Sequence, residues 1–296
     1  MNQPRILAIT LNWQQPETTL ACVHALRAMH YPSLDILVID NGSKDGSANY
    51  LRERLPPEVQ LLPLPENIGF ASGNNLGLRL AAEQQYDLAL LLNNDAFAAS
   101  EMLAALVAEY APDIGLLSPK IYFAAERERI WFANGRMHPL TLDLRDTGRG
   151  QLDGPAWQSS RDADYLLGTC LLVNLSAMVQ VGLLDERFFM YFEDLDWSLR
   201  FRQAGYRLRL VASAHLYHAV AMSSGGLESP GRRYHLARSS VIFWRRYASW
   251  GSPVLILLFR LASGLKMSAR LLWYRQIASL RAYWQGLLEG WVTQLK

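Results

Sequence analysis

Three short apolar runs that each end in polar residues constrain the fold more than any other feature of this chain. They occupy residues 5–13 (RILAITLNW), 34–40 (LDILVID) and 86–95 (YDLALLLNND). Continuous apolar runs of this length are typical of parallel strands that are covered on both faces. The intervening segments 18–29 and 73–85 have apolar residues at helical spacing. Strands that alternate with helices predict an α/β fold with a mostly parallel central sheet flanked by helices.

The composition is that of a folded protein with a full core. Half of the 296 residues are hydrophobic and 19% are charged, which permits one large domain or two smaller ones. Cys22 and Cys170 have no partners at metal-ligand spacing, so we expect both in the core and infer a reducing compartment. The first 13 residues have the pattern of a strand and lack that of a signal peptide, which predicts a cytoplasmic protein.

Polar residues follow the first two predicted strands, and in sheets of this kind ligands bind beyond the carboxyl ends of the strands. The first end holds Thr10 and Asn12, and the second holds Asp40 before the turn NGSKDGS. A carboxylate at the second end can accept hydrogen bonds from ribose hydroxyls or a base N–H. The same composition also suits an ordinary tight turn, so the residues by themselves leave both interpretations open.

The third strand end, in LLLNNDAF, places Asn93, Asn94 and Asp95 at the same edge of the sheet. Their amide and carboxylate oxygens suit a hard cation that is held by one or two carboxylates and by diphosphate oxygens. The alternative is that Asp95 caps the helix predicted at 101–110.

The segment 66–78 (ENIGFASGNNLGL) combines asparagines with glycines spaced four apart. These residues are Asn67, Gly69, Gly73, Asn74, Asn75 and Gly77. Glycines at the start of a helix let backbone N–H groups approach a phosphate closely. The segment contains neither the Gly-Lys-Ser/Thr of a Walker A loop nor the GxGxxG of dinucleotide enzymes.

Three acids lie within four positions at the start of a helical pattern in residues 188–208 (FFMYFEDLDWSLRFRQAGYRL). Glu193, Asp194 and Asp196 could provide a base for proton transfer, or they could be capping acids that the helix dipole favours. Arg200 and Arg202 cannot both share a helix face with Asp194, since they fall about 120° and 80° away from it. Ion pairing within the cluster, or a solvated surface, is the interpretation we prefer for these arginines.

Taken together, these segments resemble one known family. In order and spacing, AITLNW, VIDNGSKDGS, ENIGFASGNNLG, LLLNNDA, YLLGTCLLV and the acidic segment match family 2 glycosyltransferases with the GT-A fold, particularly rhamnosyltransferase-like members. The resemblance covers roughly residues 6–224. It implies a GT-A, Rossmann-like sheet, a nucleotide-diphosphate sugar as donor, and Mg²⁺ or Mn²⁺ as cofactor. It also implies that the first acid of the metal motif is replaced here by Asn93, which leaves Asp95 as its only ionised ligand.

The resemblance assigns roles to individual residues. For donor binding it implies Thr10, Asn12, Asp40, Asn67, Gly69, Asn75, Asn93 and Asn94. For the metal it implies Asp95 and His218, with His215 as the alternative histidine. For catalysis it implies Asp194 as general base, with Glu193 and Asp196 shaping the acceptor pocket or capping the helix. For the acceptor it implies Gly168, Thr169 and Trp197.

The C-terminal part differs from the rest in charge. Residues 232–296 hold 11 Lys or Arg and one acid, whereas residues 1–231 hold 18 basic and 26 acidic side chains. Five tryptophans are interleaved with the basic residues, which suits helices at an anionic membrane surface. The alternatives are helices packed on the catalytic domain or on a second copy, as in a homodimer. The apolar run at 252–265 is too short to span a bilayer, which needs about 20 residues.

These observations predict two domains and a metal-dependent enzyme. Residues 1–231 would be the catalytic domain, with a donor half at about 1–97 and an acceptor half at about 98–231, and 232–296 a basic helical extension. We expect an inverting glycosyltransferase at the inner face of the cytoplasmic membrane, with dTDP-rhamnose as the best guess for the donor and a cell-surface glycan or lipid-linked acceptor. No nucleic-acid-binding module is recognisable, so nucleic acid is not an expected partner.

Two other classes remain open. Because Asn93 replaces an acid of the metal motif, a catalytically silent protein that binds nucleotide-sugars or carbohydrates is the main alternative. A nucleotidyltransferase would share the sheet plan. It would also be expected to carry a Gly-rich loop with Lys or Arg after the first strand, where this chain has NWQQPETT.

Overall fold

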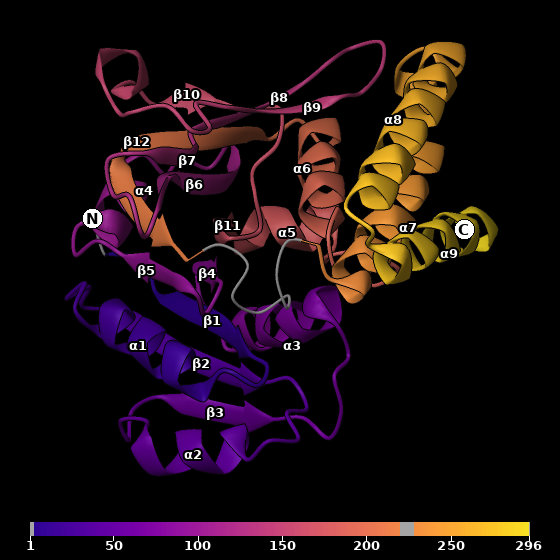
Figure 1. The fold of residues 1–296 in the computed structure, drawn as a ribbon. Coiled ribbons are helices and arrows are strands. Elements are labelled where there is room, and N and C mark those ends of the chain that lie inside the picture. The colour runs from indigo at the N-terminus through magenta and orange to yellow at the C-terminus, as the bar shows by residue number, and fades with distance from the viewer. Residues whose placement is uncertain (1–2, 220–227, 296) are drawn as a thin grey trace.

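The computed structural model describes residues 3–219 and 228–295 and contains one large sheet with helices on both faces (Figure 1). The strand order is β10 (Arg161–Asp162), β12 (Arg207–His218), β6 (Ile114–Phe123), β11 (Cys170–Asn174), β4 (Leu88–Leu92), β1 (Ile6–Asn12), β2 (Leu34–Asp40) and β3 (Gln60–Pro63). In addition, β5 (Ala96–Ala98) pairs with β12, and β7 (Ile130–Phe132) pairs with β6. A separate hairpin joins β8 (Asn134–Met137) to β9 (Leu144–Thr147).

Most of the long strands run in one direction. Strands β1 to β4 pair in parallel, and β11 is antiparallel to both β4 and β6. Because β12 is parallel to β6, the strands β4, β6 and β12 share one direction, and their carboxyl ends lie at one edge of the sheet. The predicted α/β class with a mostly parallel central sheet is therefore confirmed, with β11 inserted in the opposite sense.

The helices lie where the apolar spacing predicted them, and others fill the acceptor half and the C-terminal part. They are α1 (Pro16–Arg27), α2 (Ser47–Arg54), α3 (Phe70–Glu83), α4 (Met102–Ala108), α5 (Leu175–Val181), α6 (Glu193–Gln203), α7 (Pro230–Tyr247), α8 (Pro253–Trp273) and α9 (Ile277–Val292), with 3₁₀ turns at Pro155–Trp157 and Ala248–Trp250.

Two of the predicted phosphate-site glycines have a packing role. A Cβ at Gly73 would lie 3.0 Å from Leu11, and one at Gly77 would lie 2.7 Å from Ile9. Both positions on α3 therefore face β1, and glycine allows the helix to approach the strand closely. The expectation that these two glycines admit a phosphate was wrong, because strand β1 occupies that space.

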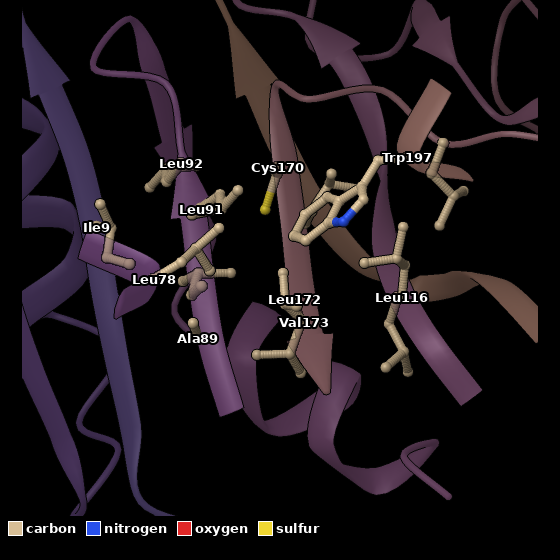
Figure 2. Close-up of a cluster of buried hydrophobic side chains, with 14 of the residues drawn as sticks. Ile9, Leu78, Ala89, Leu91, Leu92, Leu116, Cys170, Leu172, Val173 and Trp197 are labelled. Carbon is tan, nitrogen blue, oxygen red and sulfur yellow. The ribbon is translucent and has the colours of Figure 1, made fainter. Parts of the chain in front are cut away.

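The core lies between the sheet and the flanking helices. Figure 2 shows part of it, where Leu91, Leu172 and Leu116 project from neighbouring strands. Cys22 and Cys170 are fully buried free thiols, as predicted.

The core continues past the predicted domain boundary after residue 231. Ile242, Phe243 and Tyr247 of α7 belong to the same buried cluster as the sheet. Helices α8 and α9 lie outside α7, on the side of the molecule away from α2 and β3 (Figure 1). Helix α7 is thus part of the main body. Ile256 near the start of α8 joins the same buried cluster, whereas many other apolar residues of α8 are exposed. Among the described residues, no helix is both long and apolar enough to cross a bilayer.

Candidate active site

A chain of hydrogen bonds joins the carboxyl ends of β1, β2 and β4. The Asn12 amide donates to Oδ1 of Asp40 at 2.5 Å, and Oδ1 of Asn12 accepts from the Thr19 hydroxyl at 2.8 Å. The Asn94 amide in turn donates to Oγ1 of Thr19 at 3.0 Å. The three predicted strand ends therefore meet, and Thr19 of α1 connects them. Sequence reasoning missed Thr19, because it lies inside a helical pattern with no feature that marks it.

Burial limits which of these residues can touch a ligand. Thr10 and Asn12 are fully buried, and Asn94 is buried with its amide bonded to Thr19. Their predicted direct contacts with a donor are not supported, since the sheet itself satisfies the amides and covers the side chains. Asp40 lies at the end of the chain of bonds, where it also accepts the Ser43 N–H at 3.3 Å.

Hydrogen bonds from Asn41 hold the turn after β2 against the loop before α3. Asn41 donates to Oδ1 of Asn67 at 3.2 Å and to the Gly69 carbonyl at 3.1 Å, and it accepts the Ile68 N–H at 3.0 Å. A Cβ at Gly42, where φ is +69°, would lie only 2.1 Å from the Glu66 backbone. Asn41 was not predicted, although its place between Asp40 and a turn glycine is a usable signal. The half-buried Asn67 helps to shape this turn.

The loop that contains Phe189, distant in sequence, packs against the start of α3. A Cβ at Gly69 would lie 2.7 Å from Phe189, and the Phe70 N–H donates to the Phe189 carbonyl at 2.7 Å. Asn75 donates to the Leu184 carbonyl at 2.9 Å and to Glu186 at 3.0 Å, and it is almost fully buried. The predicted donor contact of Asn75 is therefore wrong, because its amide holds the loop at 184–186. Gly69 likewise permits the close approach of Phe189, at a position where we had expected a phosphate group.

Asp95 and His218 are brought together by the pairing of β5 with β12. Nε2 of His218 lies 3.1 Å from Oδ1 of Asp95, and both side chains are buried. Nδ1 of His218 has no partner within the described residues, and the ring packs edge-on against Trp131 with a centroid distance of 4.7 Å. The following residues of that sequence motif, 220–226, lie outside the described residues.

The donor atoms present fit a divalent cation that shares its coordination with a substrate. In the described parts of the chain no group of three or more His, Cys, Asp or Glu side chains is arranged to hold a metal. One carboxylate and one imidazole are nevertheless adequate where diphosphate oxygens and water complete the shell. The half-buried Asn93, beside this pair, has its backbone N–H bonded to the Thr169 carbonyl at 3.0 Å.

His215 is not an alternative metal ligand here. Its Nε2 lies 3.2 Å from the Ala212 carbonyl, and its ring packs edge-on against Tyr122. Burial lowers the pKa of His215, with a further contribution from Lys120. Its environment is that of a structural histidine.

Asp194 lies at the start of α6, facing the segment before β11. Its Oδ2 accepts the Gly168 N–H at 2.7 Å, and its Oδ1 accepts the Leu195 N–H at 2.8 Å. The side chain is half-buried, and loss of hydration raises the pKa of Asp194 to about 6, although the N–H donors favour the ionised form. The arrangement provides a carboxylate that is mostly ionised at neutral pH and unusually basic for an Asp.

Glu193 immediately precedes Asp194 and is more buried. It is 5% exposed, and its Oε2 has no hydrogen-bond partner among the described residues. Burial, together with the neighbouring Asp194 carboxyl, raises the pKa of Glu193 well above its usual range. Both effects favour the protonated form of Glu193 more than in an exposed Glu.

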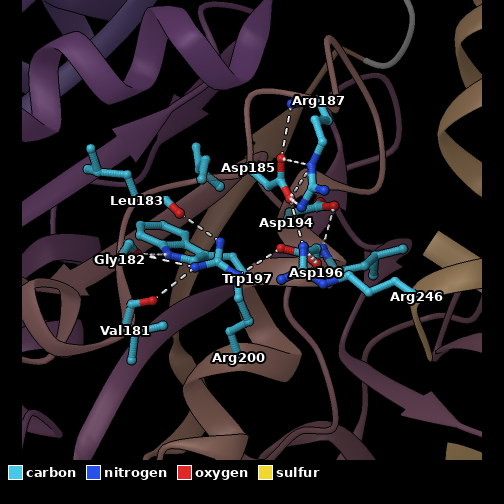
Figure 3. A network of polar contacts seen from close by, with 12 residues as sticks. Val181, Gly182, Leu183, Asp185, Arg187, Asp194, Asp196, Trp197, Arg200 and Arg246 are labelled. Carbon is cyan, nitrogen blue, oxygen red and sulfur yellow. Dashed lines mark hydrogen bonds and ion pairs between the residues drawn. The ribbon is translucent and has the colours of Figure 1, made fainter. Parts of the chain in front are cut away.

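Asp196 belongs to a network of buried charges (Figure 3). Its Oδ2 accepts from Nε of Arg200 at 2.8 Å, and its Oδ1 accepts from the Tyr247 hydroxyl at 2.7 Å and lies 3.0 Å from Nη1 of Arg246. The side chain is fully buried. The predicted catalytic role of Asp196 is wrong for this reason, because both oxygens are occupied and neither faces solvent.

Trp197 and the two arginines of α6 are structural. Trp197 is fully buried and donates its indole N–H to the Gly182 carbonyl at 2.8 Å, so the predicted acceptor contact is also wrong. Arg200 pairs with Asp196, and Arg202 lies 3.5 Å from Asp164. Ion pairing within the acidic cluster is confirmed for Arg200, whereas Arg202 is partly exposed and pairs outside the cluster.

Gly168 and Thr169 connect the two parts of the site. The Gly168 N–H binds Asp194, and the Thr169 carbonyl accepts the Asn93 N–H. A Cβ at Gly168 would lie 3.4 Å from Asp194. These two bonds place the Asp194 carboxylate next to the end of β4.

The arrangement of the sheet and site defines a class of protein, the GT-A glycosyltransferase fold. Solved structures with this fold resemble the chain over most of its length. The crystal structure of GalNAc-T7 with UDP, GalNAc and Mn²⁺ matches with a TM-score of 0.66 and 15% identity over 83% of this chain and 50% of that chain. Mannosyltransferase PcManGT from Pyrobaculum calidifontis, in complex with GDP-Man and Mn²⁺, matches with a TM-score of 0.58 and 16% identity over 99% of this chain and 87% of that one.

The sequence identifies the family within that class. Residues 7–158 match the model of glycosyl transferase family 2, and residues 89–293 match that of glycosyl transferase family group 2. The chain therefore belongs to glycosyl transferase family 2, and within that family it resembles rhamnosyltransferases. It is 29% identical over 245 residues to N-acetylglucosaminyl-diphospho-decaprenol L-rhamnosyltransferase of Mycobacterium tuberculosis, covering 73% of this chain and 76% of the relative. It is 25% identical over 177 residues to rhamnosyltransferase WbbL of Escherichia coli, covering 57% and 67%.

Proposed function

We propose that this protein is an inverting glycosyltransferase in which Asp194 is the general base. One observation carries the proposal: a half-buried carboxylate, held by the N–H groups of Gly168 and Leu195, whose pKa is raised to about 6. A base with a pKa near neutrality is ionised in the cell and still accepts a proton effectively.

The proposed step is a single displacement. Asp194 accepts the proton of an acceptor hydroxyl while the hydroxyl oxygen forms a bond to the anomeric carbon of the donor sugar. The bond from that carbon to the diphosphate oxygen breaks on the opposite face, and the nucleotide diphosphate leaves with the electron pair. Glu193 is less suited to this role, because it is buried beside Asp194. The configuration of the anomeric carbon is inverted.

The donor is proposed to lie along the carboxyl ends of β1, β2 and β4. Asp40, which is 1% exposed and bonded to Asn12, would shape the nucleoside end of this site, and the half-buried Asn67 and Asn93 would line the path toward Asp95. Asp95 and His218 would hold Mg²⁺ or Mn²⁺ beside the diphosphate, and Gly168 and Thr169 would face the acceptor. A bound divalent cation supplies charge neutralisation at the leaving diphosphate.

The relatives suggest the sugar and the acceptor. Besides the decaprenol-linked rhamnosyltransferase, the chain is 20% identical over 221 residues to dTDP-rhamnosyl transferase RfbF of Shigella flexneri, covering 71% of each. We therefore propose dTDP-rhamnose as donor, a lipid-linked or cell-surface glycan as acceptor, and a role in cell envelope polysaccharide biosynthesis.

Helices α8 and α9 support a membrane-bound acceptor. Val254, Leu258, Leu261, Leu265 and Leu272 are each more than half exposed. At about 100° per residue they fall within about 60° of arc, as one apolar stripe along α8. Trp273 of α8 and Trp291 of α9 are also exposed, at 84% and 65%. The excess of basic residues in this region suits an anionic inner membrane surface, whereas a second copy would bring like charges together.

Vesicle binding tests this part of the proposal. Leu265→Glu combined with Trp273→Ser is expected to weaken binding to anionic vesicles by about tenfold, since each change removes apolar contact with the lipid. Val179→Glu, which alters an exposed apolar residue on α5, is the matched control. Equal vesicle binding by all three proteins, or a change in oligomeric state alone, would favour contact with a second copy.

The transfer reaction itself is tested by donor binding and product analysis. We would titrate nucleotide-sugars with and without Mn²⁺ or Mg²⁺, and then determine the anomeric configuration of any product by NMR. Metal-dependent binding of one donor, followed by transfer with inversion, supports the proposal. Donor binding with no turnover on any lipid-linked acceptor would support a silent binding protein, and retention of configuration would exclude Asp194 as a simple base.

A further inference from the structure

The loop that leads into Asp194 has an unusual backbone. Tyr191 and Phe192 have φ angles of +67° and +70°, although neither is glycine. Such residues are uncommon and persist where the surrounding structure holds them. The turn that they make sets the direction in which α6 begins, and Asp194 is the second residue of that helix.

Helix α7, more than 40 residues later in the chain, holds this loop along its length. Arg238 donates to the Arg187 carbonyl at 2.8 Å, and the Ser239 hydroxyl donates to the Met190 carbonyl at 2.9 Å. Aromatic packing adds to these bonds, since His235 stacks on Phe189 at 4.9 Å and Phe243 packs against Phe192 at 5.4 Å.

Arg246 joins the two ends of the same loop. Its Nη1 donates to Oδ2 of Asp185 at 2.7 Å and lies 3.0 Å from Oδ1 of Asp196 (Figure 3). Asp185 lies before the strained turn, and Asp196 lies two residues after Asp194. The side chains of Asp185 and Asp196 are 13% and 0% exposed, so water has little access to either. Each acid also has a second arginine partner, since Asp185 accepts from Nε of Arg187 at 2.9 Å and Asp196 from Nε of Arg200 at 2.8 Å. Arg246 contacts both acids.

We propose that Arg246 is a positioning residue for the carboxylate of Asp194, because it fixes the distance between Asp185 and Asp196 and thereby holds the left-handed turn at Tyr191 and Phe192. The inference rests on the proposed function, in which Asp194 is the base. It makes α7 part of the site, although the sequence assigned that helix to a separate extension. Arg200 differs, since its other bonds are to carbonyls at 181–183 and not to the loop.

The test compares Arg246→Gln with Arg245→Gln. Arg245 is the next residue of α7 and donates to the carbonyls of Gly290 and Thr293 on the side of α9. For Arg246→Gln we expect kcat to fall by about tenfold or more while KM for the donor stays within about twofold, because small displacements of a catalytic group are costly. Arg246→Lys should recover part of the loss, and Arg245→Gln should leave kcat close to that of the wild type.

Amide hydrogen exchange provides a readout that does not need activity. The N–H groups of Gly168 and Leu195 bind the Asp194 carboxylate, so in Arg246→Gln both should exchange faster while amides of β1 and β4 are unchanged. If Arg246→Gln does not fold, Tyr247→Phe and Ser239→Ala each remove one hydrogen bond from the same assembly and should give smaller increases.

The outcomes separate the two proposals. Unchanged exchange at Gly168 and Leu195, kcat within about twofold of the wild type, or an equal loss in Arg245→Gln would overturn the positioning role. Faster exchange at these two amides in a protein whose wild type transfers no sugar would uphold the positioning of Asp194 and reject its role as base.

Discussion

The two sides of the site differ in how their polar groups are satisfied. On the donor side, Asn12, Asp40, Thr19 and Asn94 bond to one another at the ends of the strands. On the other side, Glu193 is buried with an oxygen that has no partner within the described part of the chain, and Asp194 has a raised pKa. Polar groups that satisfy one another define a shape, whereas a carboxylate with a raised pKa provides reactivity. Substitutions on the two sides should therefore affect different measured quantities.

The sharpest test of this difference is Asp194→Asn. Loss of the base should lower kcat by about 10²-fold or more while donor affinity is retained, since the amide keeps the size of the side chain but cannot take the proton. Steady-state kinetics and donor titration on the same preparation measure both. Turnover within a few-fold of the wild type would remove Asp194 from the role of base.

A smaller effect is expected for the proposed metal ligand. His218→Gln should weaken the metal-dependent part of donor binding by about tenfold, because it replaces a ligand beside Asp95. His215→Gln is the matched control, as that histidine lies on the same strand and contacts the Ala212 carbonyl. Calorimetric titration of Mn²⁺ in the presence of donor measures the change. The same metal response in both variants would contradict the assignment.

The donor side is tested by Thr19→Val. The substitution keeps the shape but leaves the amide of Asn94 and Oδ1 of Asn12 without their shared partner. We expect a loss of about 1 to 3 kcal/mol in the free energy of unfolding. The donor KM should rise more than kcat falls, as urea denaturation and kinetics would reveal. A fall in kcat alone would contradict the division between the two sides.

The smallest expected effect is a pH-dependent change in stability. The folded-state pKa of Asp194, about 6, exceeds its ordinary value of 3.8, so ionisation destabilises the fold. This penalty is absent below about pH 4 and grows as pH rises toward 6 and above. Allowing for the partial exposure of the side chain, the stability of Asp194→Asn relative to the wild type should increase by about 1 to 2 kcal/mol between pH 4 and pH 7.5.

Thermal unfolding of both proteins at pH 4 and pH 7.5 measures the difference. A stability gap that stays constant between the two pH values would show that the pKa of Asp194 is not raised. The wild-type activity should also fall as pH drops below about 6, since protonated Asp194 cannot act as a base.

Local patterns were sufficient to predict where the site lies. Apolar runs ending in polar residues predicted β1, β2 and β4, because a strand that is covered on both faces has this composition in any context. The meeting of Asn12, Asp40 and Asn94 follows from parallel pairing alone. The early position of Glu193 and Asp194 in α6 was also visible as acids before a helical pattern.

Exposure was not predictable for individual polar residues. Asn75 was expected to bind a donor, but its partners are Leu184 and Glu186, more than 100 residues away in sequence. Trp197 was expected at an acceptor, yet it is fully buried and its indole N–H donates to the Gly182 carbonyl. Whether an amide or an indole faces solvent depends on which distant segment packs on it, and no local pattern records that.

The sequence by itself determined the fold class, the family and the edge of the sheet at which chemistry is expected, because periodicity and strand-end composition are local properties. Tertiary structure decided the rest. It buried Asp196 completely and left Asp194 half-buried. It also brought Arg246 of α7 onto the loop that leads into Asp194. The physical reason is that pKa values and positioning depend on desolvation and on contacts between segments that are far apart in the chain.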